Sequence, residues 1–310
     1  MSHNFSGRKT AIVIASALTL GSVSLSASAA LSITTINNSA NAVSTLVPAL
    51  LAPGSGITVI GGSEAYQGTN NANLQQSGTY TGFSLAPSSG STPTLTMADG
   101  IFLTSGNANI PLTNTLNNFT GGSGSGANAQ LGALSASAGG TATTNDANVL
   151  SFNFTVGATI NSVSANFVFG TDEFPTQSVT DIFGFFVDGV NYAKFSTGEL
   201  ISNTPGNPTN FILNPVGSGL YGIEYNGLTQ VFSVTGQLDS TLSIHNISIG
   251  IADTSDTIFD SGVFVSSLTA GTNAGCGGIG CVNGVPEPGS LALMALALAA
   301  AAVFGARRRS

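Results

Sequence analysis

The chain has 310 residues, and it contains 14 acidic residues, six Lys or Arg residues and no Trp. Between Leu31 and Val285 there are thirteen acidic residues and one cation, Lys194, so this segment has a formal charge of −12. Such a surface repels phosphate backbones, which argues against nucleic acid as a partner. The β-branched and aromatic runs supply enough apolar surface for a core, which argues against a disordered chain.

The N-terminus has the three parts of a secretory signal peptide. Arg8 and Lys9 precede the apolar run Ala11–Leu25, and the small residues SASAA follow it. We place the cleavage after Ala29 and expect residues 1–29 to be removed. The alternative is an N-terminal membrane anchor.

Strand patterns dominate the following segment. Alternating apolar and polar residues predict half-buried strands over Leu150–Val156 and Val163–Phe169, and the apolar run Ile182–Val187 suits a strand buried on both faces. Asp188-Gly189 then predicts a tight hairpin into residues 190–195. Shorter strands are expected at residues 57–60, 80–85, 95–103, 231–234, 242–251 and 262–268.

Two other segments depart from this strand pattern. Apolar spacing over residues 41–51 predicts a short helix, although Pro48 disfavours a regular one. Residues 114–145 are rich in Gly, Ser, Ala and Asn and are expected to form a long flexible loop. We therefore predict an all-β fold, an antiparallel β-sandwich or jelly roll with a short N-terminal helical segment.

Two groups of acidic residues lie at the ends of expected strands. Carboxylates beside buried strands need a partner, and this chain has almost no cationic side chains to supply one. Oxygen-rich loops of this kind are what Ca²⁺ requires, although neither group has the EF-hand spacing. We predict a calcium site from one or both groups; solvated loop acids or backbone caps are the alternative. The candidate ligands are Asp172, Glu173, Asp181, Asp253, Asp256 and Asp260.

Cys276 and Cys281 are the only cysteines, in the sequence CGGIGC. An exported location favours a disulfide between them. Two cysteines alone do not make a zinc site, which takes four ligands.

The C-terminus combines three features in order. Pro286, Glu287 and Pro288 are followed by the uncharged apolar run Leu291–Ala306 and then by three arginines. The run would rise about 24 Å, short of the ~30 Å hydrocarbon core but workable with local thinning. This tail resembles the PEP-CTERM sorting signal of exosortase substrates in Gram-negative bacteria. The resemblance implies a transmembrane helix, an exosortase as partner, and attachment or release at the cell surface; a plain tail anchor is the alternative.

Three motifs in the middle of the chain carry a second resemblance. They read GTDEFP, DIFGFFVDG and IADTSDTIFDSGVFV, with looser agreement upstream. Together they resemble the choice-of-anchor L domain of bacterial surface proteins, over about residues 41–268, with a departure at Thr171. The resemblance implies architecture and surface display but no reaction. We therefore divide the chain into a signal peptide (1–29), a choice-of-anchor-L-like β domain (31–270), a Gly/Cys linker (271–285) and a sorting signal (286–310).

No set of residues predicts catalysis. His245 is the one histidine of the central segment and lies in an expected strand, so a Ser-His-Asp triad is not indicated. Asp172 and Glu173 are adjacent and diverge in extended chain, while a long-range glycosidase pair such as Glu173 with Asp256 stays open. We predict a non-enzymatic structural or adhesive protein, displayed on or released from the cell and associated with extracellular polysaccharide. The alternatives are a calcium-dependent glycan hydrolase or lyase and a calcium-stabilised spacer.

Overall fold

The structure is a computed structural model that describes residues 30–90, 92–116, 119–122, 124, 126–175, 181–202, 208–218, 220–273 and 275–281. The expected signal peptide and the expected transmembrane helix of the sorting signal lie outside these residues. Within the described ranges, no helix has both the length and the apolar character needed to cross a membrane.

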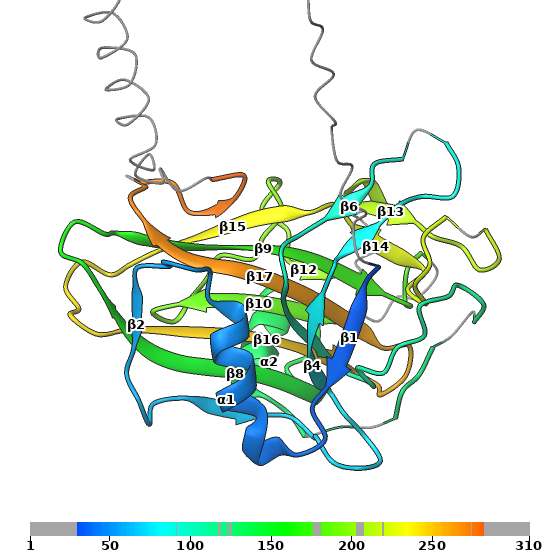
Figure 1. Cartoon of the computed structure of the whole chain (residues 1–310), viewed down its shortest axis with the longest axis horizontal. Coiled ribbons are helices and arrows are strands. Elements are labelled where there is room, and N and C mark those ends of the chain that lie inside the picture. Colours follow the sequence, from blue (N-terminus) through cyan, green and yellow to red (C-terminus); the bar gives the residue numbers. More distant parts are fainter. Residues whose placement is uncertain are drawn as a thin grey trace, which may run out of the picture.

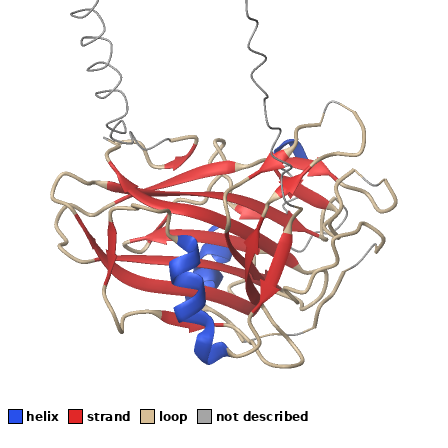
Figure 2. Ribbon diagram, viewed as in Figure 1, coloured by secondary structure: helices blue, strands red, loops and turns tan. Residues whose placement is uncertain are grey.

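Two antiparallel β-sheets face each other, as Figures 1 and 2 show. The main path of the nine-stranded sheet runs through β1 (Ser32–Thr35), β4 (Ser77–Thr81), β7 (Gly100–Thr104), β17 (Ser261–Gly271), β9 (Ser162–Thr171), β14 (Gly227–Thr229) and β13 (Phe211–Leu213). Off this path, β15 (Phe232–Gln237) pairs with β9 and with β18 (Gly278–Ile279). The prediction of an antiparallel all-β fold is confirmed.

The seven-stranded sheet forms the second layer. Its main path runs through β11 (Val190–Asn191), β10 (Ile182–Val187), β16 (His245–Thr254), β8 (Thr144–Val156) and β2 (Ile57–Val59). Two further strands, β12 (Ile201–Ser202) and β3 (Ala65–Gln67), pair with β10 and β8 respectively. A separate two-stranded sheet consists of β5 (Ser84–Leu85) and β6 (Leu95–Thr96).

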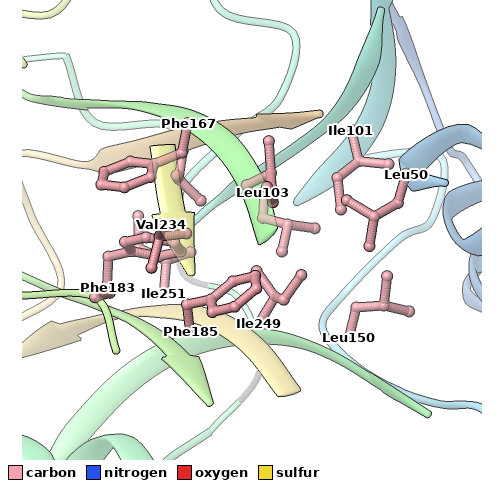
Figure 3. Packing of buried hydrophobic residues seen from close by; sticks show 14 of the residues in the cluster. Leu50, Ile101, Leu103, Leu150, Phe167, Phe183, Phe185, Val234, Ile249 and Ile251 are labelled. Carbon is pink, nitrogen blue, oxygen red and sulfur yellow. The ribbon is translucent and has the colours of Figure 1, made fainter. Parts of the chain in front are cut away.

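The main hydrophobic core lies between the two sheets (Figure 3). Alternate residues of each long strand point into it, because successive strand side chains face opposite sides of a sheet. Phe167 of β9, for example, contacts Phe183 of β10, with ring centroids 5.1 Å apart. Each fully buried side chain of this kind contributes about 1.5–3 kcal/mol. The other labelled side chains are Leu50, Ile101, Leu103, Leu150, Phe185, Val234, Ile249 and Ile251.

The outer faces of both sheets are also covered. Phe102 and Phe264 stack on the outer face of the nine-stranded sheet, with ring centroids 4.3 Å apart, beneath the β5–β6 region and residues 220–225. Phe186 and Val149 belong to a third cluster on the outer face of the seven-stranded sheet. All six residues of β10 are buried, which confirms the expectation of a strand covered on both faces.

The helices confirm one prediction and correct another. Helix α1 (Ala42–Leu50) forms where expected, with Pro48 inside it, and follows the 3₁₀ turn η1 (Ser39–Asn41). The expected flexible loop 114–145 instead contains α2 (Ala129–Ser137). Asn128 caps this helix by accepting from the N–H groups of residues 130 and 131, each at 3.0 Å. Leu131 and Leu134 of α2 then pack on the seven-stranded sheet. A second 3₁₀ turn, η2, spans Pro208–Asn210.

The segment expected to be a linker is partly folded onto the domain. Cys276 and Cys281 form a disulfide, and β18 within this loop pairs with β15. Gln237 Nε2 donates to the Cys276 carbonyl at 2.6 Å, and the Thr235 hydroxyl donates to the Cys281 carbonyl. The folded body therefore continues to residue 281.

Candidate metal centre

The register of β10 and β16 places two predicted ligands side by side. Ile182 pairs with Ala252 in this antiparallel ladder. Asp181 immediately precedes Ile182, and Asp253 immediately follows Ala252, so the two carboxylates lie at the same end of the pair.

The register of β9 and β17 does the same in the other sheet. Thr171 pairs with Ser261, so Asp172 follows one strand where Asp260 precedes the other. The Asp172 N–H donates to the Asp260 carbonyl at 3.2 Å, which extends the ladder by one step.

Glu173 and Asp146 complete a group of six acids that act on one another electrostatically. Glu173 contributes to the rise in the pKa of Asp181, and its own pKa is raised in part by Asp253. Asp146, near the start of β8, contributes to the rise in the pKa of both Asp253 and Asp260. We call this group the buried acidic cluster; its members are Asp146, Asp172, Glu173, Asp181, Asp253 and Asp260.

All six side chains are removed from solvent. Glu173, Asp181, Asp253 and Asp260 are 0% exposed, and Asp172 and Asp146 are 3% and 4% exposed. Burial penalises an ionised carboxylate strongly unless it is paired and hydrogen-bonded. None of the six is therefore a solvated loop acid.

A covering loop, residues 119–122 and 124, is attached to three of the acids. The Phe119 N–H donates to Asp172 Oδ2, and the Gly121 N–H donates to Asp260 Oδ2. The Gly124 N–H donates to Asp146 Oδ1 at 2.8 Å. Each of these carboxylates thus uses one oxygen to hold the loop backbone.

The remaining carboxylate oxygens make no hydrogen bond of normal geometry, although the Ser261 and Ser105 hydroxyls lie close to Asp181 and Asp253. Asp146 Oδ2, Asp172 Oδ1 and Asp260 Oδ1 are buried without one. Both side-chain oxygens of Glu173, of Asp181 and of Asp253 are also buried without one. In most native proteins buried polar atoms are satisfied, so this concentration requires a specific explanation.

Burial and mutual repulsion raise the pKa values of the cluster. Burial first, and Asp256, Asp253 and Asp172 next, raise the pKa of Glu173 to about 9. Burial is the main cause that raises the pKa of Asp172 and of Asp260 to about 7. Burial, followed by the charge of Glu173, raises the pKa of Asp181 well above its usual range; the nearby Ser261 hydroxyl and Asp253 carboxyl offset only part of this rise.

Two further buried hydroxyl groups lie beside the cluster. The Ser261 hydroxyl is near Asp181, and the Tyr225 hydroxyl is close enough to Asp260, Asp172 and Asp181 for their charges to raise its pKa, after burial as the main cause. Neither hydroxyl makes a hydrogen bond of normal geometry. Both are oxygen donors available to a ligand in the cluster.

Five of the six sequence-predicted ligands lie in the buried acidic cluster, and Asp256 does not. Asp256 is only partly buried, and its Oδ1 accepts from the Ile258 N–H at 3.3 Å. Its position at the rim matches the alternative expectation of a loop acid that caps a backbone N–H. Its charge nevertheless acts on Glu173.

The sequence prediction missed Asp146 as a member and missed the covering loop. Asp146 has a φ of 51°, a conformation that few residues other than glycine adopt. An isolated Asp before an expected strand gave only a weak signal in the sequence, and the loop contributes backbone atoms that no side-chain motif reveals.

The arrangement is not an assembled metal site as it stands. Among the described residues, no group of three or more His, Cys, Asp or Glu side chains is placed ready to hold a metal ion. The donors present are all oxygens, which suits Ca²⁺ or Mg²⁺ rather than zinc.

His245 lies at the other end of β16 and takes no part in the cluster. Its Nδ1 is 2.8 Å from Asp188 Oδ2 in the β10–β11 turn, and its ring packs 5.6 Å from that of Phe154 between centroids. Asp188 also accepts from the N–H groups of residues 239 and 246, at 2.9 and 2.8 Å. The pair therefore fixes a hairpin turn, as expected for a packed strand histidine.

Comparison with known proteins identifies two segments. The model of the choice-of-anchor L domain family matches residues 35–269, and that of the PEP-CTERM protein-sorting motif matches residues 284–309. No curated protein and no solved structure matches the chain. The sorting motif marks the protein for processing by an exosortase and for export to the surface or the extracellular space of a bacterium. With most of its length covered by the first match, the chain belongs to the choice-of-anchor L domain family.

Proposed function

We propose that this protein is a non-enzymatic structural or adhesive component of the cell surface, associated with extracellular polysaccharide. The observation that carries the proposal is the burial of the acidic cluster. A glycosidase needs two carboxyl groups on either side of a bound glycosidic bond. Glu173, the acid of the glycosidase pair considered above, is 0% exposed, which supports a structural role for it rather than contact with a sugar.

Three of the cavities on the described surface support the same conclusion. Three cavities have volumes of about 440, 330 and 450 Å³, and none of them is lined by two acidic residues. The third contains Asp239 and His245, but the His245 Nδ1 is bonded to Asp188 in the hairpin turn. These cavities lack the pair of carboxylates that the alternative of a glycan hydrolase requires.

The order of the segments supports surface display. The described fold extends to Cys281, and the match to the sorting motif begins at residue 284. In this proposal the apolar segment that follows holds the protein in the membrane until an exosortase processes it, and the β domain faces the extracellular matrix.

The proposal is tested on protein recovered from its own cells. We expect affinity electrophoresis to show retardation in gels that contain the cells' own extracellular polysaccharide, and reducing-end assays to detect no cleavage of that polysaccharide. Cleavage that is lost in Glu173→Gln, but retained in the exposed control Glu199→Gln, would establish the hydrolase instead.

A calcium-stabilised spacer without a ligand is the second candidate. The unpaired oxygens of the acidic cluster favour it, because they point to a structural ion and require no surface site. A spacer would show no retardation in the gels, so the same measurement separates it from the adhesive function.

A further inference from the structure

We infer that the buried acidic cluster is a divalent-cation centre that takes calcium, and that Asp146 and the covering loop are parts of it. The inference does not depend on the proposed function, because it concerns how the fold is held together. It rests on the unpaired buried oxygens, on the absence of a neighbouring cation, and on how the covering loop is attached.

The fold buries a group of carboxyl groups without a cationic side chain beside them. Six carboxylates lie at one end of the sandwich, and no Lys or Arg of the described chain is paired with them. The ion pair among the described residues is that of His245 with Asp188, at the other end of β16. Lys194, the one Lys or Arg between residues 30 and 281, is exposed and lines two of the surface cavities. Carboxylates that are ionised and buried without a partner are strongly destabilising, so a cation from outside the chain would stabilise the cluster.

The cluster supplies many oxygen atoms that could bind a cation. Nine carboxylate oxygens of the cluster lack a hydrogen-bond partner. Calcium takes six to eight oxygen ligands at about 2.3–2.6 Å, so the cluster has enough donors for one complete shell. The hydroxyls of Ser261 and Tyr225, which are not acids, lie beside the same carboxylates and make no hydrogen bond of normal geometry.

The chemistry of these donors favours calcium over zinc and magnesium. Zinc prefers nitrogen and sulfur donors, while His245 and the disulfide-bonded cysteines lie outside the cluster. Magnesium demands a near-ideal octahedron and keeps several waters, whereas the donors here are crowded and fully buried. An irregular, all-oxygen and strongly anionic shell is what calcium accommodates.

The covering loop is attached to three carboxylates of the same cluster. Asp146, Asp172 and Asp260 each hold a loop N–H with one oxygen and leave the other unpaired. A cation that binds the unpaired oxygens would fix the same carboxylates that hold the loop. Cation binding should therefore hold the covering loop in place.

The test compares melting temperatures in calcium and in chelator at neutral pH. Calcium at about one hundred times its dissociation constant should raise the melting temperature of the full chain by about 5–10 °C. Asp181→Asn should lose most of this rise, and in chelator it should melt at a higher temperature than the wild type, because the fold no longer has to bury this ionisable carboxyl group. Glu199→Gln, at an exposed acid outside the cluster, should behave as the wild type.

A second readout follows the covering loop directly. Hydrogen exchange at the amides of Phe119, Gly121 and Gly124 should slow at least tenfold on addition of calcium. If Asp181→Asn does not fold, Asp146→Asn replaces it, with a smaller loss of the calcium shift expected. Equal melting and exchange in calcium and chelator would overturn the inference, and an equal shift with magnesium would overturn the assignment to calcium.

Discussion

Glu224 offers a test of the region beside the cluster, where its charge contributes to the rise in the pKa of Asp172. This carboxylate is fully buried and accepts hydrogen bonds from the Thr113 and Thr115 hydroxyls, at 2.5 and 2.9 Å. It also accepts from the N–H groups of Thr115 and Leu116, at 3.0 and 2.8 Å. Glu224 therefore fixes the chain just before the covering loop.

We expect Glu224→Gln to destabilise the protein clearly. The amide keeps one acceptor oxygen but turns an NH₂ group toward N–H or O–H donors, so charge-assisted bonds are lost and buried donors are left unpaired. Hydrogen bonds to charged groups contribute about 1.5–3 kcal/mol each, and the amide retains part of the set, so we expect a loss of about 2–4 kcal/mol. In a domain of this size, that lowers the melting temperature by about 5–15 °C.

The pH dependence of this loss identifies its cause. Burial alone would raise the pKa of Glu224, but the hydrogen bonds from Thr113, Leu116 and Thr115 together lower it below its usual value. The ionised carboxylate therefore contributes stability above the usual pKa of an unfolded Glu, about 4.3, and loses it as the pH falls through the folded-state pKa. Wild type and variant should differ fully at neutral pH and converge in acid.

Thermal melts of both proteins across this pH range make the measurement, with the exposed Glu199→Gln as the control. A Glu224→Gln variant that melts with the wild type at neutral pH would refute the reasoning. So would a difference that persists unchanged at a pH where Glu224 is protonated, because the loss would then come from shape and not from charge.

Three further substitutions test the packing of the fold. Gly100→Ala should destabilise the protein by about 1–3 kcal/mol, because the new Cβ would overlap a carbonyl of β17. Gly61→Ala, at a position with open space around it, should be neutral or slightly stabilising. Equal melting temperatures of the two variants would contradict this. Phe167→Ala should lose about 3–5 kcal/mol in urea titrations with an unchanged m-value, and a loss below 1 kcal/mol would show that the aromatic core relaxes. Replacing Cys276 and Cys281 by Ser opens a six-residue loop and should lower stability by about 2 kcal/mol, as measured by melting, against no change if the β15–β18 contacts suffice.

The strands were predictable where side chains alternate strictly. Residues 150–156 and 163–169 lie within β8 and β9, since one inward face recurs at every second residue. Helix α2 was missed because its small residues resemble a loop in composition. Its formation depends on the Asn128 cap and on a sheet face that tertiary structure supplies.

The candidate site was predictable in its acids and not in its assembly. Asp172, Asp181 and Asp260 stood out because carboxylates flank apolar strands in a chain with few charges. Their approach to one another depends on strand register, which no local pattern specifies. Glu224 was missed because its partners lie far along the chain, at a separation of 109 residues between Glu224 and Thr115.

The positions of β16 and β17 determine how much of the chain must be present before the domain can fold. These strands come last among the long ones, yet β17 lies between β7 and β9, and β16 lies between β10 and β8. A nascent chain that stops short of them lacks an interior strand in each layer, and neither half of the core can close. β17 ends at Gly271 and the sorting motif begins at residue 284. The last interior strand and the sorting motif are therefore synthesised almost together.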